Sequence, residues 1–560
     1  MSLIDLASLV LAPTATKEGK VYSAIPDTGD GDMTFTRGSS ATRVNSAGLI
    51  EKERGNLLVQ SNTFSTNWGT SSATITGGQS GYDGSSDAWL LDSSSEGYLF
   101  QYVTSSNVGT LSIYAKANSV NNLRLRTFGA SINAEGFFDL ENGVVGSSTN
   151  LVDLSIESIG GGWYRCSVVY DNAPSLIRIY PSVSSSTSSG TIGSVYIQDA
   201  MLNEGLVAQP YIETTTTAVY EGITDDVPRV DYSGGGCPSL LLEPQRTNLL
   251  TDSEYFGSWS LNAGGISSIE PNYSVSPEGL QNAYKVNFVV QGDSDLALRK
   301  GHLVTGGATY AYSIYIKGEG SNIGKDVVIK SKRSGGDSAG TTTFQTLTDE
   351  WVRIDFTTTY AANNTAANFY ISSNDATSVL VWGAQAELGS YSTSYLPTYG
   401  TSTTRVQDSC YKTGISELIG QTEGTMFFEG SVEHTPENVS IMNFDRSTVF
   451  SIVLIKQTND KINALVYNGG SSLFSIVSTA ISGKFKCAIA YKSGDTAFYV
   501  NGTQIGVNTT TFTPAAGLDD IYIGSYSSPY FAYDHPVECN QALLFKTRLS
   551  NEELAELTKL

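Results

Sequence analysis

Hydrophobic and polar residues alternate over many short stretches of the chain, which is the pattern of a β-strand with one buried face. In residues 110–116, for instance, every second residue is apolar: Leu111, Ile113 and Ala115. Clusters of Gly, Ser and Asn separate such stretches and favour tight turns between strands. The pattern predicts an all-β protein in which antiparallel sheets pack face to face, with little helix.

Two short segments carry sharper local signals. Residues 551–557 are predicted to form a helix, because Ser550 can cap its first turn and the acidic residues that follow complement the helix dipole. The pair Asn501-Gly502 lies between two apolar stretches and favours a type I′ turn, so we expect a β-hairpin there.

The chain contains an internal repeat with a period of about 190 residues. Five segments recur in the same order in both copies. They are 56–68 and 248–259, 83–89 and 278–284, 112–116 and 313–317, 163–165 and 351–353, and 198–211 and 385–395. Such an ordered series is hard to obtain by chance, so we predict two copies of one module.

The repeated segments resemble a known class of module. Each copy has an opening Asn-Leu-Leu-x-x-Ser-x-x-Phe segment with a Trp shortly after it, then a Trp-x-Arg strand and a closing strand rich in Gln and Glu. This order is similar to that of the jelly-roll carbohydrate-binding modules attached to many glycosidases. The resemblance implies a jelly-roll fold for both copies.

Two further resemblances concern the rest of the chain. Residues 35–50 and 227–248 resemble segments of tail-fibre and other structural proteins of bacteriophages, which implies a virion protein. From residue 407 onward, a series of segments resembles laminin-G or concanavalin-like sandwiches. The segments are 424–430, 484–491, 497–502, 521–524 and 548–554.

The expected fold class is therefore all-β, with tandem antiparallel β-sandwiches: two jelly rolls plus one laminin-G-like sandwich. We predict an N-terminal attachment segment, a first module, a crossover that packs with the N-terminal segment, a second module and a terminal sandwich. Their bounds are 1–55, 56–219, 220–247, 248–406 and 407–560.

Charge and cysteine content exclude several functions. Lys and Arg number 33 against 55 Asp and Glu, a net charge of −22 that argues against nucleic acid as a partner. The five cysteines lack C-x-x-C spacing, which argues against a disulfide framework or a zinc site.

Residues 1–13 lack the basic start of a signal peptide, and no apolar stretch is long enough to span a bilayer. We therefore expect that the chain does not insert into a membrane. We also expect that it is assembled in the host cytoplasm and acts at the virion surface.

Aromatic residues are the candidates for sugar contact, because the C–H-rich face of a pyranose ring packs on an aromatic ring. Tryptophans that recur at equal positions in both copies are typical of a core. Aromatic residues without a counterpart are the better candidates for exposed contact. We select Tyr98, Phe100, Tyr102, Tyr522, Tyr526 and Tyr530.

Equivalent turns in the two copies offer oxygen ligands for a structural Ca²⁺. The residues are Asp83 and Asp87 in the first copy and Glu278 and Asn282 in the second. The alternative is that these are turn residues whose side chains satisfy their own backbone.

Catalysis has little support, because each of the three histidines stands alone in the sequence and forms no Ser-His-Asp or Cys-His set. We expect a virion structural protein, a fibre, spike or head-surface appendage, that binds host-surface polysaccharide weakly and multivalently. Its other expected partners are virion proteins and copies of itself, with a homotrimer favoured. The alternatives are a purely structural capsid decoration or tail-assembly component, and a polysaccharide depolymerase, since a glycosidase needs only two carboxylates.

Overall fold

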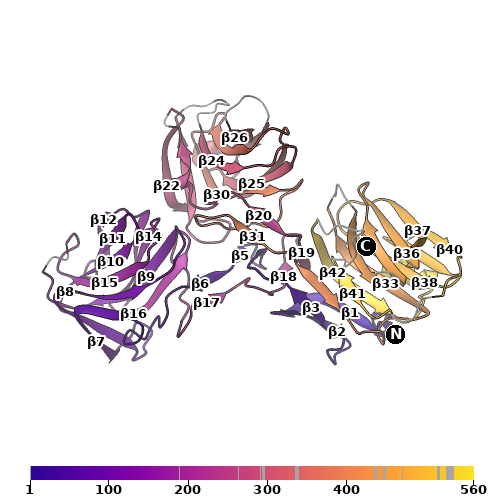
Figure 1. Ribbon diagram of the computed structural model, residues 1–560, viewed down its shortest axis with the longest axis horizontal. Coiled ribbons are helices and arrows are strands. Elements are labelled where there is room, and N and C mark those ends of the chain that lie inside the picture. The colour runs from indigo at the N-terminus through magenta and orange to yellow at the C-terminus, as the bar shows by residue number, and fades with distance from the viewer. Residues whose placement is uncertain are drawn as a thin grey trace.

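The computed structural model places the chain in three β-sandwich lobes around a small central junction (Figure 1). It describes residues 2–187, 190–262, 264–289, 292, 297–334, 340–433, 438–444, 450–468, 471–513, 518–524 and 535–560. Every strand pair among these residues is antiparallel, as the alternation of apolar residues predicts. The all-β class with tandem sandwiches is confirmed.

The two local signals are also confirmed. Helix α1 (Asn551–Leu557) begins after Ser550, whose hydroxyl accepts a hydrogen bond from the Glu553 amide at 3.3 Å. The Glu553 carboxylate accepts one in return from the Ser550 amide at 2.7 Å. At the hairpin, Asn501 and Gly502 have φ values of 49° and 77°, as a type I′ turn requires. No helix within the described parts of the chain is long and apolar enough to cross a membrane.

The first module forms the left lobe of Figure 1. Its strands are β7 (Gly69–Gln79), β8 (Ala88–Tyr102), β9 (Gly109–Ala117), β10 (Asn122–Phe128), β11 (Asn133–Asp139), β12 (Val144–Thr149), β13 (Asp153–Gly160), β14 (Trp163–Tyr170), β15 (Leu176–Ser182) and β16 (Gly193–Glu204). One end of the long strand β8 pairs with β16 and the other with β15. Strand β8 therefore joins the two layers of the sandwich into one continuous sheet.

The second module forms the upper lobe and has two separate five-stranded sheets. One contains β21 (Ser260–Leu261), β24 (Leu298–Leu303), β29 (Ala366–Ser373), β26 (Asp326–Arg333) and β27 (Gly340–Thr346). The other contains β22 (Ile266–Ser274), β23 (Ala283–Phe288), β30 (Ser378–Leu388), β25 (Thr309–Lys317) and β28 (Val352–Thr359). Strands β23 and β24 take the place of the two ends of β8. Short 3₁₀ turns lie at Phe256–Ser258 and Gly320–Asn322.

Equivalent side chains make equivalent hydrogen bonds in the two modules. Asn56 donates to the carbonyls of Ala200 and Ile212, and Asn248 donates to those of Ala384 and Leu396. The indole N–H of Trp68 and that of Trp259 each donate to a backbone carbonyl at 3.0 Å. In each module a serine hydroxyl meets a tyrosine hydroxyl at 2.7 Å. The repeated segments thus fix the same internal contacts, which is why they recur.

The third sandwich, the right lobe, is built from both ends of the sequence and from part of the crossover 220–247 (Figure 1). Its strands are β1 (Leu9–Lys17), β2 (Lys20–Ile25), β3 (Met33–Thr36), β18 (Arg229–Asp231), β19 (Ser239–Leu242), β32 (Ser409–Lys412), β33 (Glu423–Ser431), β34 (Val439–Phe444), β35 (Phe450–Lys456), β36 (Lys461–Asn468), β37 (Ser471–Ala480), β38 (Phe485–Lys492), β39 (Thr496–Val500), β40 (Thr503–Asn508), β41 (Ile521–Ile523) and β42 (Val537–Phe545). A 3₁₀ turn, Leu3–Leu6, precedes β1.

The position of β1 to β3 differs from the separate N-terminal attachment segment that we expected over residues 1–55. Strand β1 pairs with β42, where Leu9 lies opposite Leu544, and β3 pairs with β32. Leu11 and Phe35 are buried in the same apolar core as Phe428. The alternating apolar residues of this segment therefore complete the third sandwich.

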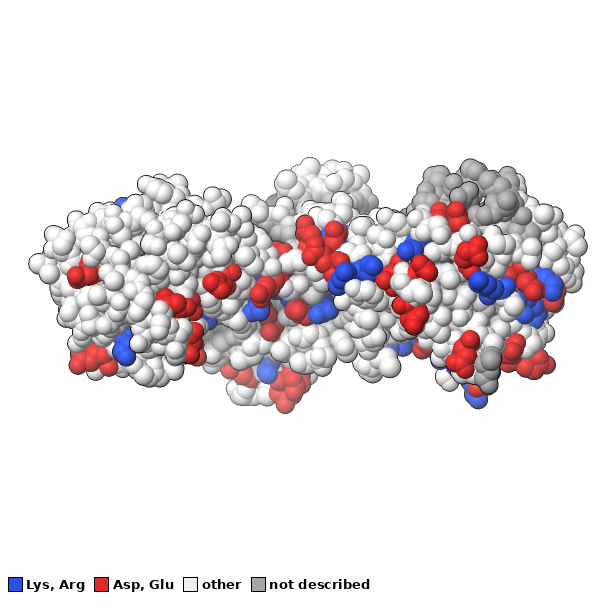
Figure 2. All heavy atoms as spheres, turned by 90° about the horizontal axis from the view of Figure 1, so that it is seen from below, with Lys and Arg blue, Asp and Glu red and all other residues white. Residues whose placement is uncertain are grey.

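The central junction contains β4 (Thr42–Val44), β5 (Ile50–Lys52), β6 (Arg54–Asn56), β17 (Val219–Glu221), β20 (Arg246–Asn248) and β31 (Thr403–Arg405). Strands β6 and β17 pair, so the crossover 220–247 lies against the N-terminal segment. Viewed from below, acidic and basic side chains gather over the centre and the right lobe, and the left lobe carries few (Figure 2).

Two buried ionic clusters hold the junction. In one, Arg37, Arg229 and Arg405 are fully buried with Asp408 and Glu243, and Arg37 meets Asp408 at 3.2 Å. In the other, the Lys52 ammonium lies 2.9 Å from a carboxylate oxygen of Glu254 and of Glu278. Burial opposes the charge on Lys52, but these two carboxylates outweigh it and raise the pKa of Lys52.

Candidate functional site

The outer face of one sheet in the first module combines arginines with aromatic rings, of which Tyr102 is the most exposed. Residues alternate along β8, β10 and β15, so that Leu99, Leu125 and Ile179 point into the core and their neighbours point outward. We call this outer surface the arginine–aromatic face. It carries Tyr98, Phe100, Tyr102, Arg124, Arg126, Phe128, Arg178 and Tyr180.

The aromatic rings of β8 form a series that opens to solvent. The ring centroids of Tyr98 and Phe100 are 6.0 Å apart, and those of Phe100 and Tyr102 are 5.8 Å apart. Tyr102 is 75% exposed. Gly69 of the neighbouring strand leaves room for the Phe100 ring, since a Cβ there would lie 2.3 Å from Phe100 Cζ. The structure therefore brings together the three aromatic residues predicted for this module.

The sequence analysis did not single out the arginines on this face. The Arg178 guanidinium carbon lies 4.2 Å from the Tyr98 ring centroid and 4.3 Å from that of Phe128. Arg126 lies 4.5 Å from the Phe128 centroid. At these distances a guanidinium is attracted by the electron-rich face of the ring. Rings from both neighbouring strands therefore lie close to the Arg178 guanidinium.

Acidic partners on this face are too few to match the arginines. Glu135 on β11 serves two of them, lying 3.1 Å from Arg124 Nε and 3.4 Å from Arg126 Nε. Arg178 donates to the Tyr180 hydroxyl at 3.3 Å. Among the residues that the structure describes, no carboxylate lies within 4.0 Å of the Arg178 nitrogens.

The second module has a related but different face. Lys330 lies 5.8 Å from the Tyr370 ring centroid, where the first module has Arg124 at 4.8 Å from Tyr180. Register places Leu303, which is 79% exposed, at the position of Tyr102. The aromatic series is therefore a property of the first copy.

The structure describes only one of the three aromatic residues predicted to contact sugar in the third sandwich. Tyr522 is half-buried on β41 and stacks on Tyr411 with ring centroids 5.8 Å apart. Tyr526 and Tyr530 lie outside the described residues. The prediction of sugar contact at these three positions stays a prediction.

The calcium candidates lie in the expected turns and have protein partners. Gln198 donates to Asp87 at 2.8 Å and to Asp83 at 3.4 Å, and Asp83 also accepts from the Ser85 amide at 3.0 Å. Glu278 pairs with Lys52 and accepts from Asn282 at 3.0 Å. Within the described residues, no group of three His, Cys, Asp or Glu side chains is arranged to hold a metal ion. Only the contact of Asp83 with the Ser85 amide is the backbone contact of a turn residue, and the calcium site stays a prediction.

A cavity of about 490 Å³ lies between the first module and the junction. Glu53, Glu204 and Tyr399 are among the residues that line it. Burial, together with Asp225 and Glu204, raises the pKa of Glu53 to about 7.

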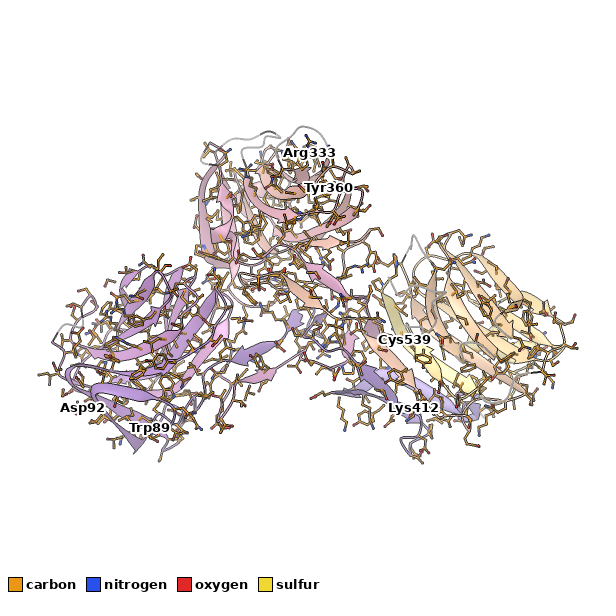
Figure 3. The ribbon with its side chains drawn as sticks, viewed as in Figure 1. Trp89, Asp92, Arg333, Tyr360, Lys412 and Cys539 are labelled. Carbon is orange, nitrogen blue, oxygen red and sulfur yellow. The ribbon has the colours of Figure 1, made fainter. Side chains whose placement is uncertain are left out.

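His302 takes part in a buried chain of hydrogen bonds. His302 is buried in the second module, where its Nε2 meets the Tyr312 hydroxyl at 2.9 Å. Tyr312 in turn meets Tyr360, which lies within the upper lobe (Figure 3). Burial lowers the pKa of His302 to about 4, so it is neutral at pH 7. Its hydrogen bonds are those of a core residue.

Comparison with known proteins adds likenesses of fold only. No family model matches the chain, and no curated protein matches it. Among solved structures, the CBM40 domain of the Ruminococcus gnavus IT-sialidase bound to α2,3-sialyllactose is 14% identical, with a TM-score of 0.22 over 25% of this chain and 84% of that one. Domain 4 of AbnA, a GH43 extracellular arabinanase from Geobacillus stearothermophilus, is 9% identical, with a TM-score of 0.24 over 27% and 73%. The leech intramolecular trans-sialidase is 15% identical, with a TM-score of 0.23 over 25% and 24%.

Proposed function

We propose that this chain is a bacteriophage virion structural protein, a fibre, spike or head-surface appendage, that binds host-surface glycans through the arginine–aromatic face of its first module. The observation that carries the binding half is the open series Tyr98, Phe100 and Tyr102 on a single sheet face. The virion half rests on the resemblance of residues 35–50 and 227–248 to segments of phage structural proteins.

Physical chemistry supports a surface of this kind as a sugar platform. Packing a pyranose ring on exposed aromatic rings removes apolar area from water, at about 25 cal/mol per Å². One such contact is weak, so repeated copies on one particle would add effective concentration rather than new contacts. A homotrimer on the virion surface fits this need.

Glycan binding by the purified chain tests the first half. We expect Phe100→Ala combined with Tyr102→Ala to abolish binding to arrayed bacterial surface glycans. Leu303→Ala is the matched control, because it removes an exposed apolar side chain from the corresponding position of the second module. Equal loss with both variants, or no binding by the wild-type chain with its β circular dichroism intact, would contradict the proposal.

Deletion of the gene tests the virion half. A binding appendage predicts intact particles that adsorb poorly to the host. Particles that fall apart would instead indicate a cementing role between neighbouring subunits.

A further inference from the structure

We infer that the arginine–aromatic face selects acidic polysaccharides and that it binds a sugar carboxylate at Arg126 and Arg178. This inference rests on the proposed glycan binding and specifies the class of glycan.

Cations are rare in this module and concentrated on this face. Residues 56–219 contain only five, namely Lys116, Arg124, Arg126, Arg165 and Arg178. Three of the five project from the same sheet face. The chain has a net charge of −22, so most of its surface repels an anion. The three arginines on this face would attract one locally.

The register places two of these cations in direct opposition. Arg126 on β10 lies opposite Arg178 on β15. Like charges that face each other across two strands destabilise a sheet. Glu135 lies near Arg126 but is shared with Arg124, which leaves Arg178 without a carboxylate partner among the described residues. A bound anion would relieve this repulsion.

The stacking of Arg178 also favours a planar ligand. Tyr98 of β8 and Phe128 of β10, the strands on either side of β15, have ring centroids 4.2 Å and 4.3 Å from the guanidinium carbon, which restricts how the guanidinium can turn. A guanidinium held in this way can present parallel N–H donors to the two oxygens of a carboxylate. The neighbouring Phe100 and Tyr102 rings would then contact the sugar that carries the carboxylate.

Binding to four polymers tests the inference: polygalacturonate and alginate, which carry carboxylates, dextran sulfate, and neutral dextran. We expect the wild-type chain to bind a carboxylated polymer more tightly than dextran, with affinity that falls as salt is raised. Arg178→Gln should weaken this binding about tenfold or more, as expected for loss of a charged hydrogen-bonding partner. Arg178→Lys, which keeps the charge and loses the planar donors, should fall between. Lys116→Gln, the same charge change on another strand of the module, should bind as the wild type does.

Thermal melting separates a binding role from a structural one. Arg178→Gln removes a repulsive like-charge contact with Arg126 but also the attractive contacts with Tyr98 and Phe128, so its melting temperature should stay close to that of the wild type. A lower melting temperature together with unchanged affinity would overturn the inference. If the chain prefers dextran sulfate and keeps this preference in Arg178→Lys, the group bound is a sulfate, and the inference of a carboxylate is overturned. Binding to neutral glycans that ignores Arg178 would overturn the inference and leave the proposed function standing, whereas no binding to any glycan would overturn both.

Discussion

Lys52 offers the sharpest test of the central junction. Lys52→Met removes the ammonium and keeps a side chain of similar length. Glu254 is fully buried and Glu278 is 7% exposed, so both carboxylates would lose their cation without gaining water. Removing one partner of a buried ion pair costs about 3–5 kcal/mol.

Proton uptake by the buried carboxyls gives a similar free-energy cost for Lys52→Met. Burial already raises the pKa of Glu254 despite the ammonium beside it, so the variant would respond by protonating a carboxyl. Protonating a glutamate whose ordinary pKa is near 4.3 costs about 3.7 kcal/mol at pH 7 and about 1 kcal/mol at pH 5. Because the folded-state pKa is raised, stability is lost as the pH rises above 4.3. The loss of unfolding free energy caused by Lys52→Met should therefore be smaller at pH 5 than at pH 7, by about 2.7 kcal/mol.

Amide hydrogen exchange of segments 250–256 and 394–400 measures this deficit locally, which suits a chain of several sandwiches that need not unfold together. Lys20→Met is the matched control, because Lys20 is 39% exposed in its pair with Asp32 and should cost below about 1 kcal/mol. Replacing Glu254 and Glu278 by Gln in the Lys52→Met background should recover most of the loss. A loss below about 1 kcal/mol at pH 7, or one that is equal at pH 5, would refute the reasoning.

Three further predictions concern single side chains. Glu53→Gln should raise the melting temperature at pH 8 and have little effect at pH 4.5, as a pH series of thermal melts can check. The reason is that the pKa of Glu53 is raised to about 7, so its buried charge destabilises the fold only as the pH rises. Gly69→Ala should displace the Phe100 ring and lower glycan affinity with circular dichroism unchanged, and unchanged affinity would exclude a role for that ring. Ser550→Ala should destabilise helix α1 by about 1 kcal/mol, seen as faster amide exchange over 551–557, since it removes the hydroxyl that accepts the hydrogen bond of the Glu553 amide.

Local features were predictable from the sequence because they depend on neighbours along the chain. Alternation gave the strands, the Asn501-Gly502 pair gave the hairpin, and the repeat identified the modules whose Asn56 and Asn248 make matching contacts. The three aromatic residues of β8 were found because they lack counterparts in the second copy.

Features that depend on distant pairing were missed. Nothing near Arg178 in the sequence indicates that it will lie opposite Arg126, because the register of β10 against β15 decides this. Likewise, the apolar residues of β1 to β3 read as strands but do not reveal that β42 is their partner. The buried cluster of Arg37 with Asp408 joins residues 371 positions apart and has no local signature.

The pairing of β1 with β42 also bears on synthesis. A ribosome releases β1 to β3 long before their partner strands exist, and both repeated modules are made in between. Each module can bury its own core as it emerges, but the apolar faces of β1 to β3 must wait for the rest of the third sandwich. Unpaired strand edges of this kind invite association with other chains. Folding of the third sandwich therefore has to wait until β42, the partner of β1, has been made.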